Sequence, residues 1–102
     1  MNKYNLQNFL TRINGKDLVD VLITTEDEVR RIDAVFLKVK KNSDEFTMIN
    51  GYRNLIGDFL FFLRSGAVPA GIGKQGLKKF ETVIKSLVDQ GCFKPTILTV
   101  FD

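Results

Sequence analysis

Residues 26–49 have the sequence EDEVRRIDAVFLKVKKNSDEFTMI, and the conformation of this stretch decides the fold class. One interpretation is a helix that begins with a capping box at Thr25, carries acids in its first turn and runs to Lys41. The other is a β-hairpin, because residues 34–39 and 45–49 are β-prone runs that flank a turn-rich segment. Both interpretations stay open, and we favour the hairpin.

Two further elements are predicted upstream of this stretch. Apolar side chains recur at helical spacing just before Gly15, which indicates a short amphipathic helix with a glycine at its C-terminal end (Leu6, Phe9, Leu10 and Ile13). Residues 18–24 form a short run that is dense in Val, Ile and Leu, which favours a mostly buried strand.

Downstream, two amphipathic helices are predicted. Residues 52–65 carry an apolar stripe at helical spacing and are followed by Gly66, and a second stripe extends over residues 77–88. The glycine-rich segment between the two helices is predicted to be a loop. Residues 96–101 are β-prone and are predicted to form a last strand, although Pro95 would equally suit the first turn of a helix.

Together these elements predict one α+β domain over residues 1–102. It comprises an N-terminal helix, antiparallel strands in a meander or hairpin, two amphipathic helices and a C-terminal strand. The polar N-terminal segment lacks the apolar run of a secretory signal, and no apolar run is long enough to span a membrane. The lone cysteine, Cys92, cannot form an internal disulfide, so we expect a cytoplasmic location.

The composition argues against most enzyme chemistry. The chain has no histidine and one cysteine, which excludes catalysis by a histidine of this chain and argues against a zinc site. We predict no catalytic residue, metal ligand or cofactor. A metal-dependent enzyme that uses carboxylates, such as Asp27 and Glu28 or Asp44 and Glu45, is a third hypothesis. Residues 71–76 match G-x-G-x-x-G, but no strand is predicted directly before them, as a dinucleotide-binding turn requires.

The positive charge of the chain suggests an alternative function. The formal net charge is +3, and the basic excess lies in the C-terminal half. Five lysines there form a candidate anion-binding or nucleic-acid-binding site (Lys74, Lys78, Lys79, Lys85 and Lys94). Three of them, Lys74, Lys78 and Lys85, would share one helix face. A small nucleic-acid-binding protein is therefore the alternative, although a solvated helix face explains the same residues.

The leading hypothesis comes from the helix predicted over residues 52–65, whose apolar residues cover more of its circumference than a surface helix requires. Phe61 and Phe62 are consecutive and therefore about 100° apart, so at least one of them points away from the main stripe. An exposed aromatic side chain on a small domain is typical of a contact surface. We expect a non-catalytic binding or assembly module that acts through self-association or a protein partner, with Phe61 and Phe62 as candidate contact residues.

Overall fold

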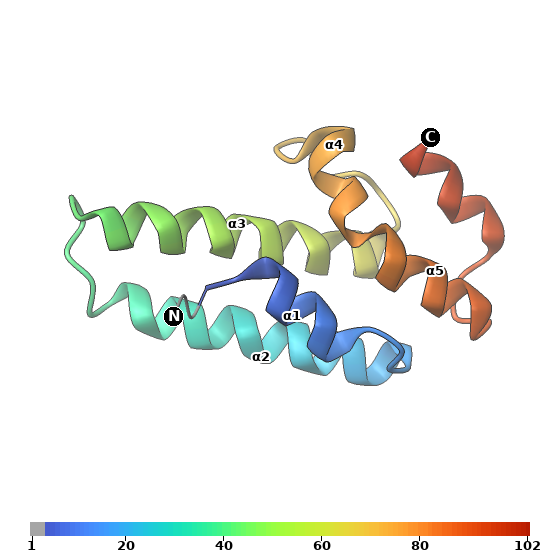
Figure 1. Ribbon diagram of the computed structural model, residues 1–102, viewed down its shortest axis with the longest axis horizontal. Coiled ribbons are helices and arrows are strands. Elements are labelled where there is room, and N and C mark those ends of the chain that lie inside the picture. The colour runs from blue at the N-terminus through green and yellow to red at the C-terminus, as the bar shows by residue number, and fades with distance from the viewer. Residues whose placement is uncertain (1–3) are drawn as a thin grey trace.

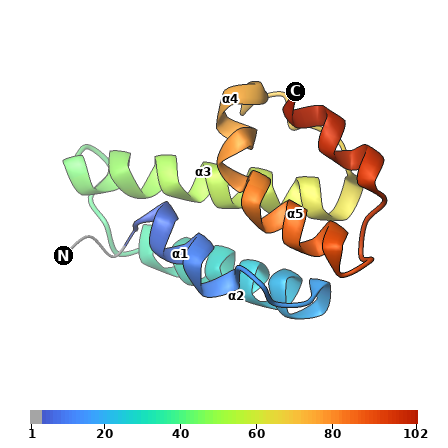
Figure 2. The same cartoon turned by 45° about the vertical axis from the view of Figure 1, so that its right-hand side comes forward.

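Two long antiparallel helices organise the structure, a computed structural model that describes residues 4–102. Figure 1 shows these helices, α2 and α3, side by side, with α1 against α2 and the C-terminal helices gathered near the second half of α3. The elements in chain order are α1 (Leu6–Ile13), α2 (Leu18–Phe36), α3 (Asp44–Ser65), α4 (Gly73–Leu77), the 3-10 helix η1 (Lys78–Phe80), α5 (Glu81–Asp89) and the 3-10 helix η2 (Pro95–Phe101). Figure 2 shows that α1 and α5 lie over the same side of the α2–α3 hairpin.

The predicted α+β fold is wrong, because residues 4–102 form helices, turns and loops without a β-strand. The predicted strand at residues 18–24 is the beginning of α2. The predicted hairpin over residues 34–39 and 45–49 is the end of α2, a turn and the beginning of α3. The predicted strand at residues 96–101 is part of η2.

Burial explains why α2 is a helix. Its buried positions follow one another at intervals of four, three and four residues, which matches one face of a helix and not one face of a strand (Val21, Thr25, Glu28 and Ile32). Its N-cap is Asp17, whose side chain accepts a hydrogen bond from the backbone N–H of Asp20 at 2.9 Å. Thr25 is therefore not a cap but an interior residue, and its Oγ1 donates to the Val21 carbonyl at 2.7 Å.

Helix α3 begins at Asp44, well before the position predicted for it. Ser43 is the N-cap, because its side chain accepts a hydrogen bond from the backbone N–H of Phe46 at 3.1 Å. Asp44 and Glu45 then place negative charge in the first turn, where the helix dipole favours it. The helix ends at Gly66 as predicted, with a left-handed φ of 71°.

The C-terminal part of the chain forms short helical pieces joined by turns. The helix predicted over residues 77–88 is present as the last residue of α4, followed by η1 and α5. Pro95 lies in the first turn of η2, so the helical alternative for the tail is the correct one. No helix in the described part of the chain is both long and apolar enough to cross a membrane.

One hydrophobic cluster connects the hairpin to the rest of the molecule. Phe59 of α3 stacks on Phe80 of η1, with ring centroids 4.3 Å apart. Phe62 of α3 lies near Phe101 of η2, with ring centroids 6.1 Å apart. Helix α1 adds buried side chains from its inner face (Phe9, Leu10 and Ile13). Each helix thus packs mainly on elements close to it in the chain, and α3 supplies the surface on which the C-terminal pieces meet.

Candidate functional site

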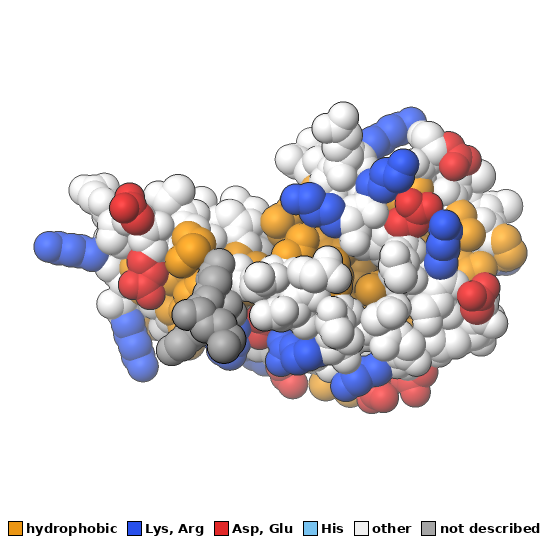
Figure 3. Space-filling view, viewed as in Figure 1, with side chains coloured by type: hydrophobic (Ala, Val, Ile, Leu, Met, Phe, Trp, Pro, Cys, Tyr) orange, Lys and Arg blue, Asp and Glu red, His pale blue; other side chains and the backbone are white. Residues whose placement is uncertain are grey.

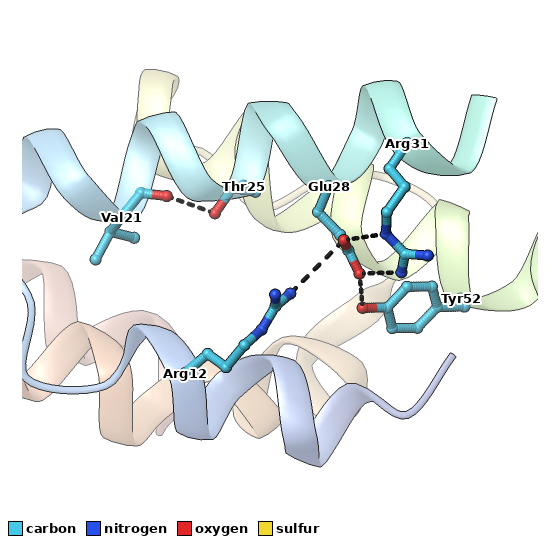
Figure 4. A network of polar contacts seen from close by, with 6 residues as sticks. All are labelled: Arg12, Val21, Thr25, Glu28, Arg31 and Tyr52. Carbon is cyan, nitrogen blue, oxygen red and sulfur yellow. Dashed lines mark hydrogen bonds and ion pairs between the residues drawn. The ribbon is translucent and has the colours of Figure 1, made fainter. Parts of the chain in front are cut away.

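A buried polar cluster lies between α1 and the α2–α3 hairpin, centred on Glu28, whose side chain is 5% exposed. Figure 4 shows its partners. Arg31 Nε donates to Glu28 Oε1 at 2.8 Å, and Arg31 Nη2 donates to Oε2 at 2.9 Å. The Tyr52 hydroxyl donates to Oε2 at 2.5 Å, and Arg12 Nη2 lies 3.6 Å from Oε1. One carboxylate therefore connects α1, α2 and α3.

Sequence reasoning did not find this cluster, although a signal was present. Glu28 lies at a core position of the α2 stripe, where an acid requires a buried partner, and Arg31 follows it one turn later. That signal is visible only once residues 18–36 are accepted as a helix. Tyr52 is 24 positions away in the chain, and no local pattern connects it to Glu28.

The surroundings of Glu28 hold it in the charged form. Burial raises the pKa of this carboxyl, but the hydrogen bonds from Arg31 and Tyr52 and the charges of Arg31 and Arg12 outweigh that effect, so the pKa of Glu28 lies below its usual value. Burial and the hydrogen bond to Glu28 raise the pKa of Tyr52. The pair therefore stays as carboxylate and neutral phenol at neutral pH.

This arrangement is suited to holding helices together rather than to proton transfer. Both oxygens of Glu28 accept hydrogen bonds, and no buried side-chain nitrogen or oxygen in the described chain lacks a partner. A general base needs a pKa near the working pH, whereas the pKa of Glu28 lies below its usual value. A hollow of about 310 Å³ lies beside the cluster, lined in part by Asn5 and Asn8.

A second feature is a groove of about 430 Å³ between α2 and α3, which we call the Phe61 groove. Its lining comes from both helices (Val29, Arg53, Gly57, Leu60, Phe61, Arg64 and Ser65). The Phe61 side chain is 50% exposed, although Leu60 and Phe62 beside it are buried. The groove faces a different side of α3 from Tyr52, because Phe61 lies nine residues further on, which turns it to the opposite side of the helix.

Ion pairs between the two helices frame the Phe61 groove. Arg53 Nε lies 3.0 Å from Asp33 Oδ1, and Arg64 Nη2 lies 3.1 Å from Glu26 Oε1. The Arg53 guanidinium passes so close to Gly57 that a side chain at this position would collide with it. Glycine in the middle of α3 therefore gives Arg53 the space to lie along the groove.

No family model, curated protein or solved structure matches this chain. Its function must therefore be inferred from the residues of these two features.

The structure separates the two phenylalanines that were predicted to make contacts. Phe61 points outward into the groove, whereas Phe62 is completely buried and packs near Phe101. Phe62 is therefore a core residue and not a contact residue. The sequence indicated that one of the pair faces away from the stripe, but not which one, because the position of the C-terminal pieces decides it.

The five predicted lysines lie in α4, η1, α5 and the segment before η2. The face expected to carry Lys74, Lys78 and Lys85 is divided among α4, η1 and α5. Lys85 Nζ is paired with Glu81 at 3.2 Å, and Lys74 Nζ donates to the carbonyl of Asp102 at 3.3 Å. Lys78, Lys79 and Lys94 are exposed. Over the C-terminal helices, the face drawn in Figure 3 shows basic side chains interspersed with acidic ones.

The remaining sequence motifs lie in ordinary structural positions. Residues 71–76 form a loop and part of the short helix α4, and α3 and a loop precede them. Residues 4–102 hold no group of three or more His, Cys, Asp or Glu side chains that could bind a metal ion. Asp27 pairs with Arg30, and Asp44 and Glu45 lie in the first turn of α3. Cys92 is partly buried against the core.

Proposed function

We propose that this protein is a non-catalytic assembly module that associates with another protein surface, in the first place its own copy, through the Phe61 groove. The observation that carries the proposal is the half-exposed Phe61 ring beside an open groove, although the nearby Phe59 and Phe62 of the same helix are fully buried. Burying such a ring gains roughly 25 cal/mol for each Å² of apolar surface removed from water.

Other features agree with this assignment. The buried carboxylate of Glu28 accepts structural hydrogen bonds from Arg31 and Tyr52, which agrees with a non-catalytic role for this cluster. Helix α2, which supplies Val29 to the groove, also carries two exposed apolar residues nearer its N-terminus, Val19 and Ile23, which are 63% and 53% exposed. A cytoplasmic location, suggested by the lone Cys92, belongs to the proposal as well.

Sedimentation equilibrium from low to high micromolar concentration tests the proposal. We expect the wild-type chain to form dimers and the Phe61→Glu variant to remain a folded monomer, because a buried unpaired carboxylate opposes association. Leu37→Glu is the matched control. Leu37 is 88% exposed at the turn after α2, so this variant adds the same charge away from the groove and should associate like the wild type.

Two outcomes would overturn the proposal. A wild-type chain that stays monomeric at high micromolar concentration would show that Phe61 is only a solvated surface residue for this chain. Equal association of the wild type and Phe61→Glu would show that the contact lies on another surface. Circular dichroism on each variant separates loss of association from loss of folding.

A further inference from the structure

The charges around the Phe61 groove are arranged with one sign on each helix. The two pairs that frame the groove both take their arginine from α3, Arg53 and Arg64, and their acid from α2, Asp33 and Glu26. The α3 border of the groove is therefore positive and the α2 border negative. A third charged residue on this side of α2, Arg30, pairs with Asp27 on the same helix.

The four paired side chains are accessible enough to face a second molecule. Their exposed fractions run from 33% for Arg53 and Glu26 to 54% for Asp33 and 56% for Arg64. Exposed pairs of this kind hold their partners weakly, so they can turn toward charges on an approaching surface. The signs of these four charges then affect the orientation in which a second molecule docks more than the strength of its binding.

The outward face of α2 has the spacing of a helix-packing seam. Its residues follow one another at intervals of four, three, four and three (Val19, Ile23, Glu26, Arg30 and Asp33). This spacing is the one by which two helices pack side chains into each other's gaps. A helix laid along the part of this face from Glu26 to Asp33 would need positive charge opposite these two acids. Helix α3 of a second copy has that charge.

Two copies can stack groove to groove about a two-fold axis in two ways. If the axis runs across the helices, each α3 lies on the partner's α3, so arginines meet arginines and acids meet acids. If the axis runs parallel to the helices, each α3 lies on the partner's α2 at the same height along the hairpin. In that second arrangement Arg64 faces the partner's Glu26, and Arg53 faces the partner's Asp33, because these residues already lie level with each other within one chain.

We propose that the partner is a second copy of this chain, docked about a two-fold axis parallel to α2 and α3. This inference rests on the proposed function and adds the geometry of the contact. Phe61 lies against the partner's α2 between Glu26 and Asp33, the segment in which Val29 lines the groove. The result is a four-helix bundle in which Glu26 and Asp33 of one copy face Arg64 and Arg53 of the other.

Two charge-reversed variants test the docking geometry. Glu26→Arg makes both borders of the groove positive near Arg64, and Arg64→Glu makes both negative. Each variant alone should dimerise at least about tenfold more weakly than the wild type, because like charges then face each other across the axis. An equimolar mixture of the two should form heterodimers with a dissociation constant within about threefold of the wild-type value.

The control is a second pair of variants with the same charge changes away from the groove, Asp89→Arg and Lys78→Glu, both at exposed positions in the C-terminal part. Each should dimerise like the wild type, and mixing them should bring no gain. If the wild type dimerises through Phe61 but the groove variants dimerise normally alone, or do not pair when mixed, the docking geometry is wrong and the self-association stands. If the wild type is monomeric, the proposed function itself fails.

Discussion

At the scale of single residues, Glu28 shows what a charged side chain requires in order to be buried in this fold. Its carboxylate accepts two hydrogen bonds from Arg31 and one from Tyr52, and Arg12 supplies a further positive charge. The aromatic ring of Tyr4 lies beside both Tyr52 and Arg31, with centroid distances of 6.0 Å to the Tyr52 ring and 5.8 Å to the Arg31 guanidinium carbon. The cluster joins polar and aromatic contacts where α1 meets the hairpin.

The cluster predicts how stability depends on pH. The pKa of Glu28 in the folded chain lies below its ordinary value of 4.5, so the folded state favours the carboxylate. The stabilisation from Glu28 is complete above about pH 5.5 and is lost as the pH falls through 4.5 toward the lower folded pKa. In urea unfolding at about pH 7, Glu28→Gln should lower the free energy of unfolding by about 1.5–3 kcal/mol.

At about pH 3 the difference between wild type and Glu28→Gln should shrink, because Glu28 of the unfolded chain is then protonated and the carboxylate stabilises the folded chain less. Tyr52→Phe is the companion variant. It removes one hydrogen bond to the carboxylate and should show a smaller difference with the same pH trend. A Glu28→Gln difference that is equal at the two pH values would mean that Glu28 is not held as a carboxylate in the folded chain.

At the scale of helices, the glycines of α3 give a test of where the helix continues and where it ends. A methyl group at Gly51 would meet no atom within 4 Å, so Gly51→Ala should raise the free energy of unfolding by about 0.5–1 kcal/mol. Gly66 has a left-handed φ of 71°, and Gly66→Ala should lower the free energy of unfolding by about 1–2 kcal/mol. Urea unfolding measures both. Stabilisation by both variants would contradict a helix end at Gly66.

The helices also show how much the sequence could predict. The stripes within residues 6–13, 52–65 and 77–88 were sufficient for α1, the second half of α3 and α5, because each repeats at helical spacing and is followed by a glycine. Residues 18–24 and 34–39 were assigned to strands because Val, Ile and Phe favour both strands and buried helix faces. The helical period of α2 becomes clear only if Thr25 and Glu28 count as core positions, and propensity gives no reason to count them.

The start of α3 and the candidate site were limited by other kinds of ambiguity. Ser43 followed by two acids is a helix cap and also a common turn, and only the chain that follows decides between them. The outward direction of Phe61 depends on η2 covering Phe62, a contact between distant parts of the chain. The ion pairs that frame the groove, such as Arg64 with Glu26, depend on the register between α2 and α3.

At the scale of the whole molecule, Phe59 is the point at which the hairpin and the C-terminal pieces share a core. The ring is fully buried and stacks on Phe80. Phe59→Ala should lower the free energy of unfolding by about 3–5 kcal/mol, through lost burial and the cavity left behind. Phe61→Ala should change the free energy of unfolding by no more than about 0.5 kcal/mol, when it is measured at concentrations at which the chain is monomeric.

The unfolding transition of Phe59→Ala should move as a single step in both circular dichroism and chemical-shift measurements on residues of α2 and α5. A shift confined to α5, with the hairpin unfolding as before, would mean that the two parts of the molecule are held by separate cores.

The packing of each helix on its neighbours in the chain has a kinetic consequence. Helix α1 packs on α2, the next helix in the chain, and α2 packs on α3, which follows it. In the C-terminal part, α5 contacts both η1 before it and η2 after it. Few native contacts must wait for a long loop to close, so the entropy lost before the first stabilising contacts form is small. Such topologies refold on the order of microseconds to milliseconds. Phe59 and Phe62 are the exception, because the rings that lie against them, Phe80 and Phe101, belong to the C-terminal pieces. The nascent hairpin therefore keeps these two rings open to solvent until the C-terminal pieces dock, and that is the stage at which aggregation competes with folding.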